Sequence, residues 1–382
     1  MKNILITGGA GFIGSNLALS LVEKGYNVTV LDNLSLQIHG ENAEEDSFLF
    51  SKIKNKVAFI KGCVTSKEDW TKALINQDAI VHLAAETGTG QSMYEIEKYV
   101  TVNIGGTALM LDLLANNMHT VKKIIVASSR SIYGEGKYWS DELNTAVYPK
   151  HRTDEFMTNR DFEVKYRGLT KPLQLLATDE ESKIHPSSVY GITKQNQEQM
   201  IMTVCPTIGI APVAFRYQNV YGPGQSLSNP YTGILSIFST LIRNGKDINI
   251  FEDGRESRDF VFIDDVVAAT ILGIEKNEAD GNVFNVGTGE ATDVITVANE
   301  LIENYGIDTK VIISGNYRLG DIRHNYADLT KITKFLGFKP SYNFEKGINK
   351  FTEWVVTQEV TESKYDMSIS EMKEKGLYKT SK

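Results

Sequence analysis

The chain has few cysteines, few prolines and no long apolar run. Its 382 residues include 2 Cys, 8 Pro and 6 His, and the histidines are scattered rather than paired at metal-ligand spacing. Cys63 and Cys205 are too few for a disulfide framework, so we expect a reducing, cytoplasmic compartment and no structural metal. No apolar run approaches the roughly 18 residues that a membrane span needs, and the first strand begins too early for a signal peptide. We therefore expect no membrane association.

An excess of positive charge is also lacking. The 40 Lys and Arg residues face 48 Asp and Glu residues, which gives a formal net charge of −8. Such a chain repels a phosphate backbone, so nucleic acid is not an expected partner. With 41% hydrophobic and 23% charged residues the composition is that of a folded globular protein. The length predicts one large domain or two lobes.

Short apolar runs alternate with helical patterns over the first 215 residues. We expect buried strands at Asn3–Thr7, Val28–Leu31, Val57–Ile60, Ala79–Leu83, Lys123–Ala127 and Ala211–Arg216. Parallel strands require crossovers of this kind. The pattern predicts an α/β fold, a Rossmann-type doubly wound parallel sheet with helices on both faces.

The pattern changes near Val220, where a loop rich in Gly, Pro and Ser begins. Beyond it we expect helices at Gly233–Asn244 and Ala291–Tyr305 and strands at Ile248–Phe251, Asp259–Ile263 and Lys310–Ile313. These elements predict a smaller mixed α/β substrate lobe of residues 216–256 plus 289–356, beside a dinucleotide-binding domain of residues 1–215 plus 257–288. We interpret residues 138–177 as a surface excursion and residues 357–382 as a loosely held polar tail.

A long helical pattern from Ser92 to Asn116 carries apolar residues on more than one face. One face is expected to cover the sheet, and the remainder needs another cover. A second copy of the chain would supply it, so we expect a homodimer through this helix and the helix near Tyr190. Burial beneath the 138–177 insertion is the alternative.

A glycine-rich turn joins the first strand to the first helix. Gly8, Gly11 and Gly14 would allow the turn, admit a pyrophosphate and let the helix pack on the strand, in that order. Asp32 follows the second strand, where a carboxylate accepts ribose hydroxyls and repels a 2′-phosphate. Asn33, rather than an arginine, comes next, so the turn predicts NAD rather than NADP.

A tyrosine four residues before a lysine can bring an ammonium close to a phenol on one helix face. The chain contains this spacing at Tyr94/Lys98, Tyr133/Lys137, Tyr190/Lys194, Tyr342/Lys346 and Tyr378/Lys382. Only Tyr190/Lys194 opens a helix and follows a strand that ends in Ser128-Ser129, on the side of the sheet where ligands bind. Ser129, Tyr190 and Lys194 are therefore expected to converge on the nicotinamide.

The glycine turn, Leu83-Ala84-Ala85, Ser128-Ser129 before Tyr133-Gly134, and Tyr190 to Lys194 resemble the extended short-chain dehydrogenase/reductases that modify nucleotide sugars. The resemblance extends to about residue 356. It implies that Tyr190 is the catalytic acid/base, that Lys194 holds the ribose and lowers the tyrosine pKa, and that Ser129 hydrogen-bonds the reacting hydroxyl.

The same resemblance implies a set of NAD contacts. These are Gly8, Gly11, Phe12, Ile13, Gly14, Asp32, Asn33, Cys63, Val64, Leu83, Ala84, Ala85, Asn103, Tyr190 and Lys194. Asn103 matches a helix asparagine that is usually structural and cofactor-side. Cys63 departs from the family pattern, which has an aspartate on the adenine amine at this position, so adenine recognition by this loop is open.

Substrate contacts are implied in the later part of the chain. Asn219 matches the family asparagine that meets the substrate diphosphate, and Arg258 and Arg318 match its cationic contacts. Asp321 is implied as a ribose or loop partner. Gln91 and Ser92 are candidate sugar contacts, with loop packing as the alternative.

The chemistry follows from what stands beside Ser129. Family dehydratases place Thr-Asp-Glu where this chain has Ser129-Arg130-Ser131, and elimination of water needs a proton donor. The resemblance therefore implies an NAD-dependent 4-epimerase that passes through a transient 4-keto sugar. A net reductase or dehydrogenase, and a non-catalytic dinucleotide sensor, are the alternatives.

Longer strings are similar to a narrower group, the dTDP-L-rhamnose 4-epimerases, which make the talose sugar nucleotide. The strings are Leu36 to Gly40, Gly88 to Tyr94, Gly222 to Tyr231 and Gly320 to His324.

Overall fold

A seven-stranded sheet forms the centre of the computed structural model, which describes residues 1–231, 233–360, 363 and 365–382. All neighbouring strands run parallel. In spatial order they are β14 (Asn282–Val286), β9 (Ala211–Tyr217), β5 (Lys123–Ser129), β4 (Ala79–His82), β1 (Asn3–Thr7), β2 (Asn27–Asp32) and β3 (Ala58–Lys61). The predicted Rossmann-type α/β fold is confirmed.

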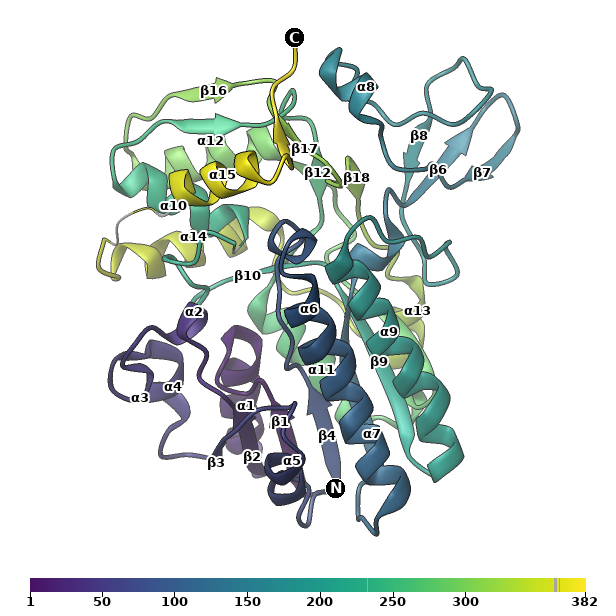
Figure 1. Ribbon diagram of the computed structural model, residues 1–382, viewed down its shortest axis with the longest axis vertical. Coiled ribbons are helices and arrows are strands. Elements are labelled where there is room, and N and C mark those ends of the chain that lie inside the picture. The colour runs from purple at the N-terminus through teal and green to yellow at the C-terminus, as the bar shows by residue number, and fades with distance from the viewer. Residues whose placement is uncertain (232, 361–362, 364) are drawn as a thin grey trace.

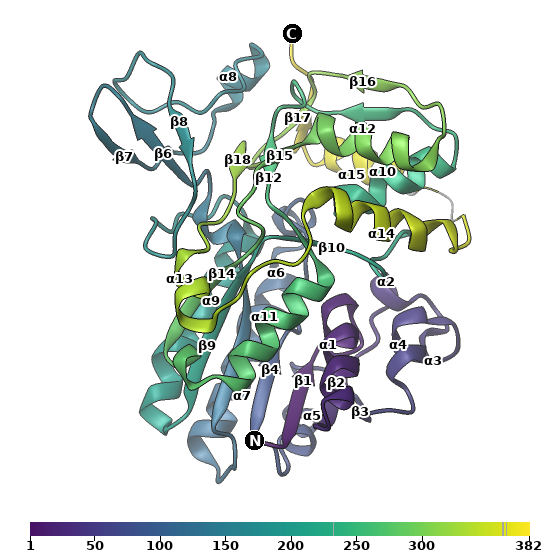
Figure 2. The same cartoon turned by 180° about the vertical axis from the view of Figure 1, so that it is seen from behind.

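Helices cover both faces of this sheet, as Figures 1 and 2 show from opposite sides. One face carries α1 (Phe12–Glu23) and α11 (Ile263–Glu275), and the other carries α5 (Lys67–Ala73), α7 (Gly106–Asn116) and α9 (Val189–Val204). The apolar run of strand β1 follows from its position in the sheet. Ile4 and Ile6 pack into the core on the α1 side and Leu5 packs into the core on the α7 side, because both faces of the strand are buried.

Two boundaries differ from the sequence-based expectation in ways that affect the cleft. Strand β5 continues to Ser129, two residues beyond the predicted end, so Ser129 stands at its carboxyl end. The long helix predicted from Ser92 is divided into a 3₁₀ turn at Gln91–Met93, α6 (Ile96–Tyr99), a π-helical segment at Val100–Gly105, and α7. The remaining elements of this half are the short helices α2 (Leu36–His39), α3 (Ala43–Asp46) and α4 (Phe48–Ile53).

A smaller mixed lobe lies beyond the carboxyl ends of the strands (Figure 1). Its helices are α10 (Ile234–Arg243), α12 (Val294–Tyr305), α14 (Phe344–Val356) and α15 (Tyr365–Glu374). Its strands pair as β10 (Asn219–Tyr221) with β13 (Phe260–Phe262), β11 (Ile248–Ile250) with β16 (Val311–Ile313), and β12 (Ser257–Arg258) with β15 (Thr292–Asp293) and β18 (His324–Asn325). Helix α13 (Thr330–Leu336) returns to the sheet beside β14 (Figure 2).

The segments interpreted as a surface excursion and a loose tail both have secondary structure. The insertion forms a three-stranded antiparallel sheet of β6 (Lys137–Ser140), β7 (Thr145–Val147) and β8 (Gln174–Leu176). Helix α8 (Asp154–Thr158) lies between β7 and β8 in the sequence. The C-terminal segment forms α15 and β19 (Tyr378–Lys379), which pairs antiparallel with β17 (Tyr317–Arg318). Ile369, Met372 and Tyr378 are buried, so hydrophobic contacts hold this segment on the lobe.

Within the described residues, no helix combines the length and apolar character that a bilayer span requires.

Candidate active site

A cleft of about 630 Å³ lies between the carboxyl edge of the sheet and the smaller lobe. The β1–α1 turn and the ends of β2, β4 and β5 form one side of it, and α9 contributes its first turns. The lobe closes the other side through the β9–β10 loop and residues of β11, β12 and β17. Ligands of doubly wound folds bind at this edge of the sheet, so the cleft is where both cofactor and substrate are expected.

The glycine turn is packed too tightly for side chains at two of its positions. A Cβ on Gly14 would lie 2.3 Å from the Gly8 carbonyl oxygen, and one on Gly8, whose φ is +66°, would lie 2.8 Å from the Ala84 nitrogen. Gly11, which precedes the first helical residue of α1, also lines the cleft together with Phe12 and Ile13. The helix N-terminus therefore presents backbone N–H groups to the cleft, which fits the pyrophosphate of a dinucleotide.

Asp32 is held at the end of β2 by two backbone donors. Its Oδ2 accepts a hydrogen bond from the Ala10 nitrogen at 2.9 Å and its Oδ1 accepts one from the Leu34 nitrogen at 2.8 Å. His39 Nε2 lies 3.9 Å from the same Oδ1, while its Nδ1 is 2.7 Å from Ser47 Oγ. Burial lowers the pKa of His39, so the imidazole is neutral at pH 7. Asp32 is thus a fixed carboxylate at the position where an adenosine ribose would lie.

Most of the other predicted cofactor residues also line the cleft. These are Asn33, Cys63, Val64, Leu83, Ala84 and Ala85. Cys63 is fixed by its backbone, because its nitrogen donates to Asp69 Oδ2 at 2.9 Å. Asn103 is an exception: it is fully buried behind the cleft, accepts from the Glu86 nitrogen at 2.7 Å and donates to Thr193 Oγ1 at 2.9 Å. It joins the loop after β4 to α9, which makes it a positioning residue.

Ser129, Tyr190 and Lys194 meet in the cleft. Helix α9 begins after Ser188, whose side chain caps it by accepting from the Gly191 nitrogen at 3.1 Å. The cap places Tyr190 in the first turn, where its hydroxyl hydrogen-bonds the Ser129 side chain. Ser129 Oγ accepts from the nitrogen and the hydroxyl of Ser131 at 3.1 and 2.9 Å, so its own proton remains available for donation.

Burial changes the pKa values of these groups. It lowers the pKa of Lys194, a residue that is 3% exposed, to about 7. The Lys194 ammonium donates to Ala127 O at 2.9 Å and to Gln197 Oε1 at 3.0 Å. Burial raises the pKa of Tyr190, while the Ser129 hydrogen bond and the positive charge of Arg130 act in the opposite direction. A further positive charge in the site would therefore favour release of the proton from this phenol.

The predicted substrate residues of the lobe lie on the opposite side of the cleft. Asn219, Arg258, Arg318 and Asp321 all line it. Arg258 Nη1 donates to the carbonyl oxygens of Ser257 and Arg323 at 2.8 and 2.9 Å, and Arg318 pairs with Asp321 Oδ2 at 2.9 Å. Cationic guanidinium groups across from the phenol fit an anionic substrate end.

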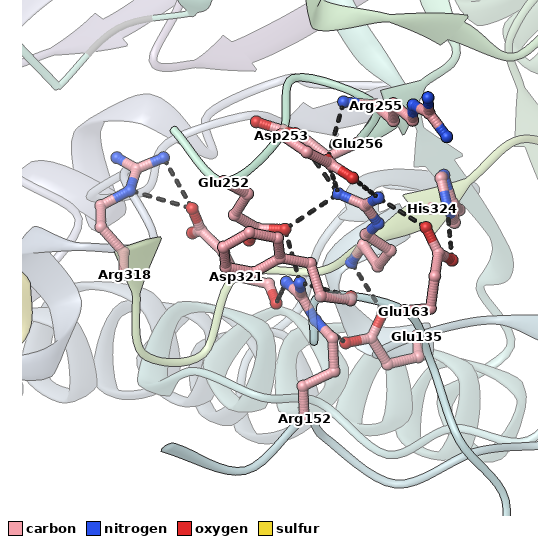
Figure 3. A network of polar contacts seen from close by, with 12 residues as sticks. Glu135, Arg152, Glu163, Glu252, Asp253, Arg255, Glu256, Arg318, Asp321 and His324 are labelled. Carbon is pink, nitrogen blue, oxygen red and sulfur yellow. Dashed lines mark hydrogen bonds and ion pairs between the residues drawn. The ribbon is translucent and has the colours of Figure 1, made fainter. Parts of the chain in front are cut away.

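A network of hydrogen bonds and ion pairs lies around Arg318 and Asp321, as Figure 3 shows. Arg152, from the insertion, contacts Glu252 Oε2 at 2.6 Å and donates to the Asp321 carbonyl oxygen at 2.9 Å. Arg323, whose carbonyl oxygen receives Arg258, pairs with Asp253 Oδ1 at 2.6 Å. The insertion therefore supports the substrate side of the cleft. Despite this concentration of acids, the described residues include no group of three or more His, Cys, Asp or Glu side chains that could hold a metal ion.

Gln91 and Ser92, the candidate sugar contacts, do not line the cleft in this structure. Both are buried. Gln91 exchanges hydrogen bonds with Gln37, and Ser92 Oγ donates to Thr89 O at 2.7 Å and accepts from the Tyr190 nitrogen at 3.0 Å. The structure thus gives these two residues a packing function, and Ser92 fixes the start of α9.

Several cleft residues were not anticipated from the sequence. They are Arg130, His39, Gln225, Glu256, Tyr365, Ser368 and Met372. Arg130 follows Ser129 directly, and this adjacency was the available signal. Glu256 directly precedes β12 and lies two residues before Arg258, and this proximity in sequence was the available signal. Nothing in the polar sequence after residue 357 indicated that Tyr365, Ser368 and Met372 would reach the cleft.

Comparison with known proteins gives one family. The model of the NAD dependent epimerase/dehydratase family matches residues 4–156 and 169–287. Among curated proteins, the chain is 37% identical over 359 residues to a dTDP-L-rhamnose 4-epimerase of Burkholderia thailandensis, covering 94% of this chain and 96% of that protein.

Solved structures agree on the fold. The UDP-glucose 4-epimerase of Thermotoga maritima, solved with UDP-glucose, superimposes with a TM-score of 0.75 and 30% identity over 93% of this chain and 99% of that one. The UDP-glucuronic acid 4-epimerase of Bacillus cereus, in complex with UDP-glucuronic acid and NAD, gives a TM-score of 0.74 at 24% identity, with 93% and 99% coverage.

Proposed function

The chain belongs to the NAD-dependent epimerase/dehydratase family, and we propose that it interconverts dTDP-L-rhamnose and dTDP-6-deoxy-L-talose by epimerisation at C4. Its class is that of an NAD-dependent nucleotide-sugar 4-epimerase. The dTDP-sugar is supported by the similarity to the Burkholderia protein over nearly the whole of both chains. Relatives that act on UDP-sugars define the competing substrates.

The observation that carries the proposed chemistry is the convergence of Ser129, Tyr190 and Lys194 opposite the cationic side of the lobe. Tyr190 would take the proton of the C4 hydroxyl and later return it, with Ser129 donating a hydrogen bond to the same oxygen. Lys194 would hold the cofactor ribose, and its charge, restored by an anionic dinucleotide, would favour the phenolate. NAD, when bound, supplies the hydride chemistry at C4.

The residues beside Ser129 support epimerisation over dehydration. Arg130 and Ser131 occupy the positions where family dehydratases carry two carboxyl groups. A guanidinium does not give up a proton near pH 7, and a serine hydroxyl is a weak acid, so neither can protonate a leaving hydroxyl. The remaining chemistry is oxidation of the carbinol and reduction of the resulting ketone from its other face.

The substrate is tested with the purified protein and no added cofactor. Panels of dTDP-, UDP-, GDP- and CDP-hexoses, dTDP-L-rhamnose included, are incubated and their products identified by NMR. We expect dTDP-L-rhamnose and its C4 epimer to interconvert to one equilibrium from either side. Conversion of a UDP-hexose but not of dTDP-L-rhamnose would contradict the substrate and leave the enzyme class unchanged.

A deuterium label separates epimerisation from net redox turnover. With deuterium at C4, an epimerase returns the label to the same carbon, and no cofactor accumulates in the reduced form. A reductase or dehydrogenase would instead transfer the label to the cofactor and produce NADH in proportion to product. The second result would replace the proposed function by that alternative.

We also propose that the enzyme is a homodimer through α6 and α9. Three large apolar side chains are exposed here, namely Ile96 of α6 at 51%, Val100 of the π-helical segment that follows α6 at 41%, and Ile192 of α9 at 46%. A second copy of the same face would cover them. Light scattering of the purified protein should give twice the chain mass, and Ile192→Glu should give the monomer. A wild-type monomer at micromolar concentration would refute the dimer.

A further inference from the structure

We propose that Arg130 binds the sugar-linked phosphate of the nucleotide-sugar substrate. Its side chain extends from the end of β5 into the cleft and reaches Asn219, to which Nε donates at 2.5 Å. This inference rests on the proposed nucleotide-sugar function and names a residue of that same site.

The guanidinium of Arg130 is only partly satisfied by the protein. Its Nη1 is buried and has no hydrogen-bond partner among the described residues, and the guanidinium forms no ion pair with any carboxylate among them. Arginines that serve the fold of this chain are different: Arg152, Arg216 and Arg323 each contact buried or half-buried carboxylates. A partly buried cation without a carboxylate at ion-pair distance is costly to keep, unless a ligand supplies the negative charge.

The surroundings of Arg130 select an anion rather than a neutral hydroxyl. Burial and, after it, the nearby charge of Arg258 lower the pKa of Arg130 to about 9, although Asp321 and Asp259 act in the opposite direction. Two guanidinium groups that face one cleft repel each other, and a phosphate between them would remove that repulsion. Asn219 can also donate a hydrogen bond to the phosphate. Its Oδ1 accepts from Arg130 Nε, and its Nδ2 donor has no partner among the described residues.

The order of residues identifies which phosphate. Arg130 follows Ser129, the hydrogen-bond partner of Tyr190, and extends toward Asn219 and Arg258 on the lobe. The group that lies between a reacting sugar carbon and the rest of the nucleotide is the phosphate attached to the sugar. A fixed contact there would hold the nucleotide while the keto sugar turns to present its other face.

The test uses the NAD-loaded protein and four nucleotides, dTDP, UDP, dTMP and UMP, measured by calorimetry. Arg130→Met should weaken binding of the preferred diphosphate by about 10- to 100-fold and change binding of the matching monophosphate by less than about threefold. Arg130→Lys should recover part of the diphosphate affinity. Arg167→Met, which removes an exposed arginine remote from the cleft lining, is the matched control and should change neither.

A second measurement separates binding from a merely structural function. Because Arg130 lacks a counterion, Arg130→Met should leave the thermal midpoint of the ligand-free protein unchanged or raise it. In an Asn219→Ala background, Arg130→Met should still weaken diphosphate binding, since the contact is with the phosphate and not only with Asn219.

Four outcomes would overturn the inference. One is that Arg130→Met weakens binding of the diphosphate and of the monophosphate equally. Another is that Arg130→Met lowers the thermal midpoint of the ligand-free protein and leaves the diphosphate affinity unchanged. The third is a wild-type protein that binds neither dTDP nor UDP, which would refute the proposed function as well. The fourth is that the wild-type protein binds a nucleoside diphosphate and Arg130→Met binds it equally well, which would refute the phosphate contact of Arg130 and leave the proposed function standing.

Discussion

Replacement of Arg152 by methionine tests whether the insertion supports the cleft through buried charge. The Arg152 side chain is 2% exposed and lies between Glu135 and Glu252, which are 1% and 3% exposed. Methionine keeps much of the volume and removes the charge, so two carboxylates lose one cation each. Glu135 keeps the Arg323 nitrogen at 2.7 Å and Glu252 keeps Arg323 Nη1 at 3.1 Å. We therefore expect Arg152→Met to lower the free energy of unfolding by about 3 kcal/mol, near the lower end of the range for a broken buried ion pair. This corresponds to roughly a 100-fold fall in the ratio of folded to unfolded protein.

The loss should depend on pH in a defined direction. Burial already raises the pKa of Glu135 while Arg152 lowers it, so removing Arg152 raises this folded-state pKa further above its unfolded value. A carboxyl whose pKa is raised by folding loses stability as the pH rises from its unfolded pKa through its folded one. The difference between wild type and Arg152→Met should accordingly be smaller at pH 5 than at pH 8.

Urea unfolding followed by fluorescence at both pH values measures this difference. Arg152→Met/Glu252→Gln, which removes one of the two stranded charges, should recover part of the loss at pH 8. Arg167→Met, an exposed arginine of the same insertion, should change the unfolding midpoint little. Equal losses at pH 5 and pH 8 would refute the electrostatic explanation and indicate that packing of the Arg152 side chain dominates.

Other changes test the catalytic and cofactor sides of the cleft. Tyr190→Phe should lower kcat by about 10²- to 10⁴-fold while NAD stays bound. Turnover measures the first effect and the cofactor released on denaturation measures the second. A near-normal kcat would remove this phenol from the mechanism. Asp32→Asn should weaken NAD more than NADP, because the carboxylate that repels a 2′-phosphate is lost, and equal titration curves for both cofactors in the wild type would contradict NAD preference. Deletion of residues 359–382 should raise KM for the nucleotide sugar by about tenfold while the NAD content stays constant, since Tyr365, Ser368 and Met372 line the cleft. An unchanged KM would show that the C-terminal segment has no part in substrate binding.

Local sequence was sufficient where the site is built from consecutive residues. The turn from Gly8 to Gly14 is recognisable because its φ value at Gly8 and its close approach at Gly14 demand glycine at fixed positions. The choice of Tyr190 over four other tyrosines with the same spacing depended on context, namely a strand ending in serine and a helix beginning after one. The structure has both features, with β5 ending at Ser129 and α9 capped by Ser188.

Contacts between segments that are distant in the sequence could not be predicted from such local patterns. Ser92 resembles a cleft residue in sequence, yet its hydroxyl turns to the Tyr190 nitrogen, which is 98 positions away. The C-terminal segment has the composition of a loose tail, but Ile369, Met372 and Tyr378 bury themselves against the lobe. In both cases the decisive interaction is tertiary, and no period or spacing in the chain encodes the partner.

The cations that line the cleft or support it divide into two kinds by their partners. Arg152, Arg318 and Arg323 have carboxylates of their own and organise the lobe without any ligand. Lys194, Arg130 and Arg258 line the cleft with hydrogen bonds only to carbonyl or amide oxygens among the described residues, and burial lowers the pKa of each. None of the three has a carboxylate at ion-pair distance among the described residues, so a bound anion would stabilise them. Lys194 stands beside the expected ribose and phenol, whereas Arg130 and Arg258 stand toward the lobe. The distribution of unpaired positive charge thus indicates a second anionic ligand beside the dinucleotide, as a nucleotide-sugar substrate requires.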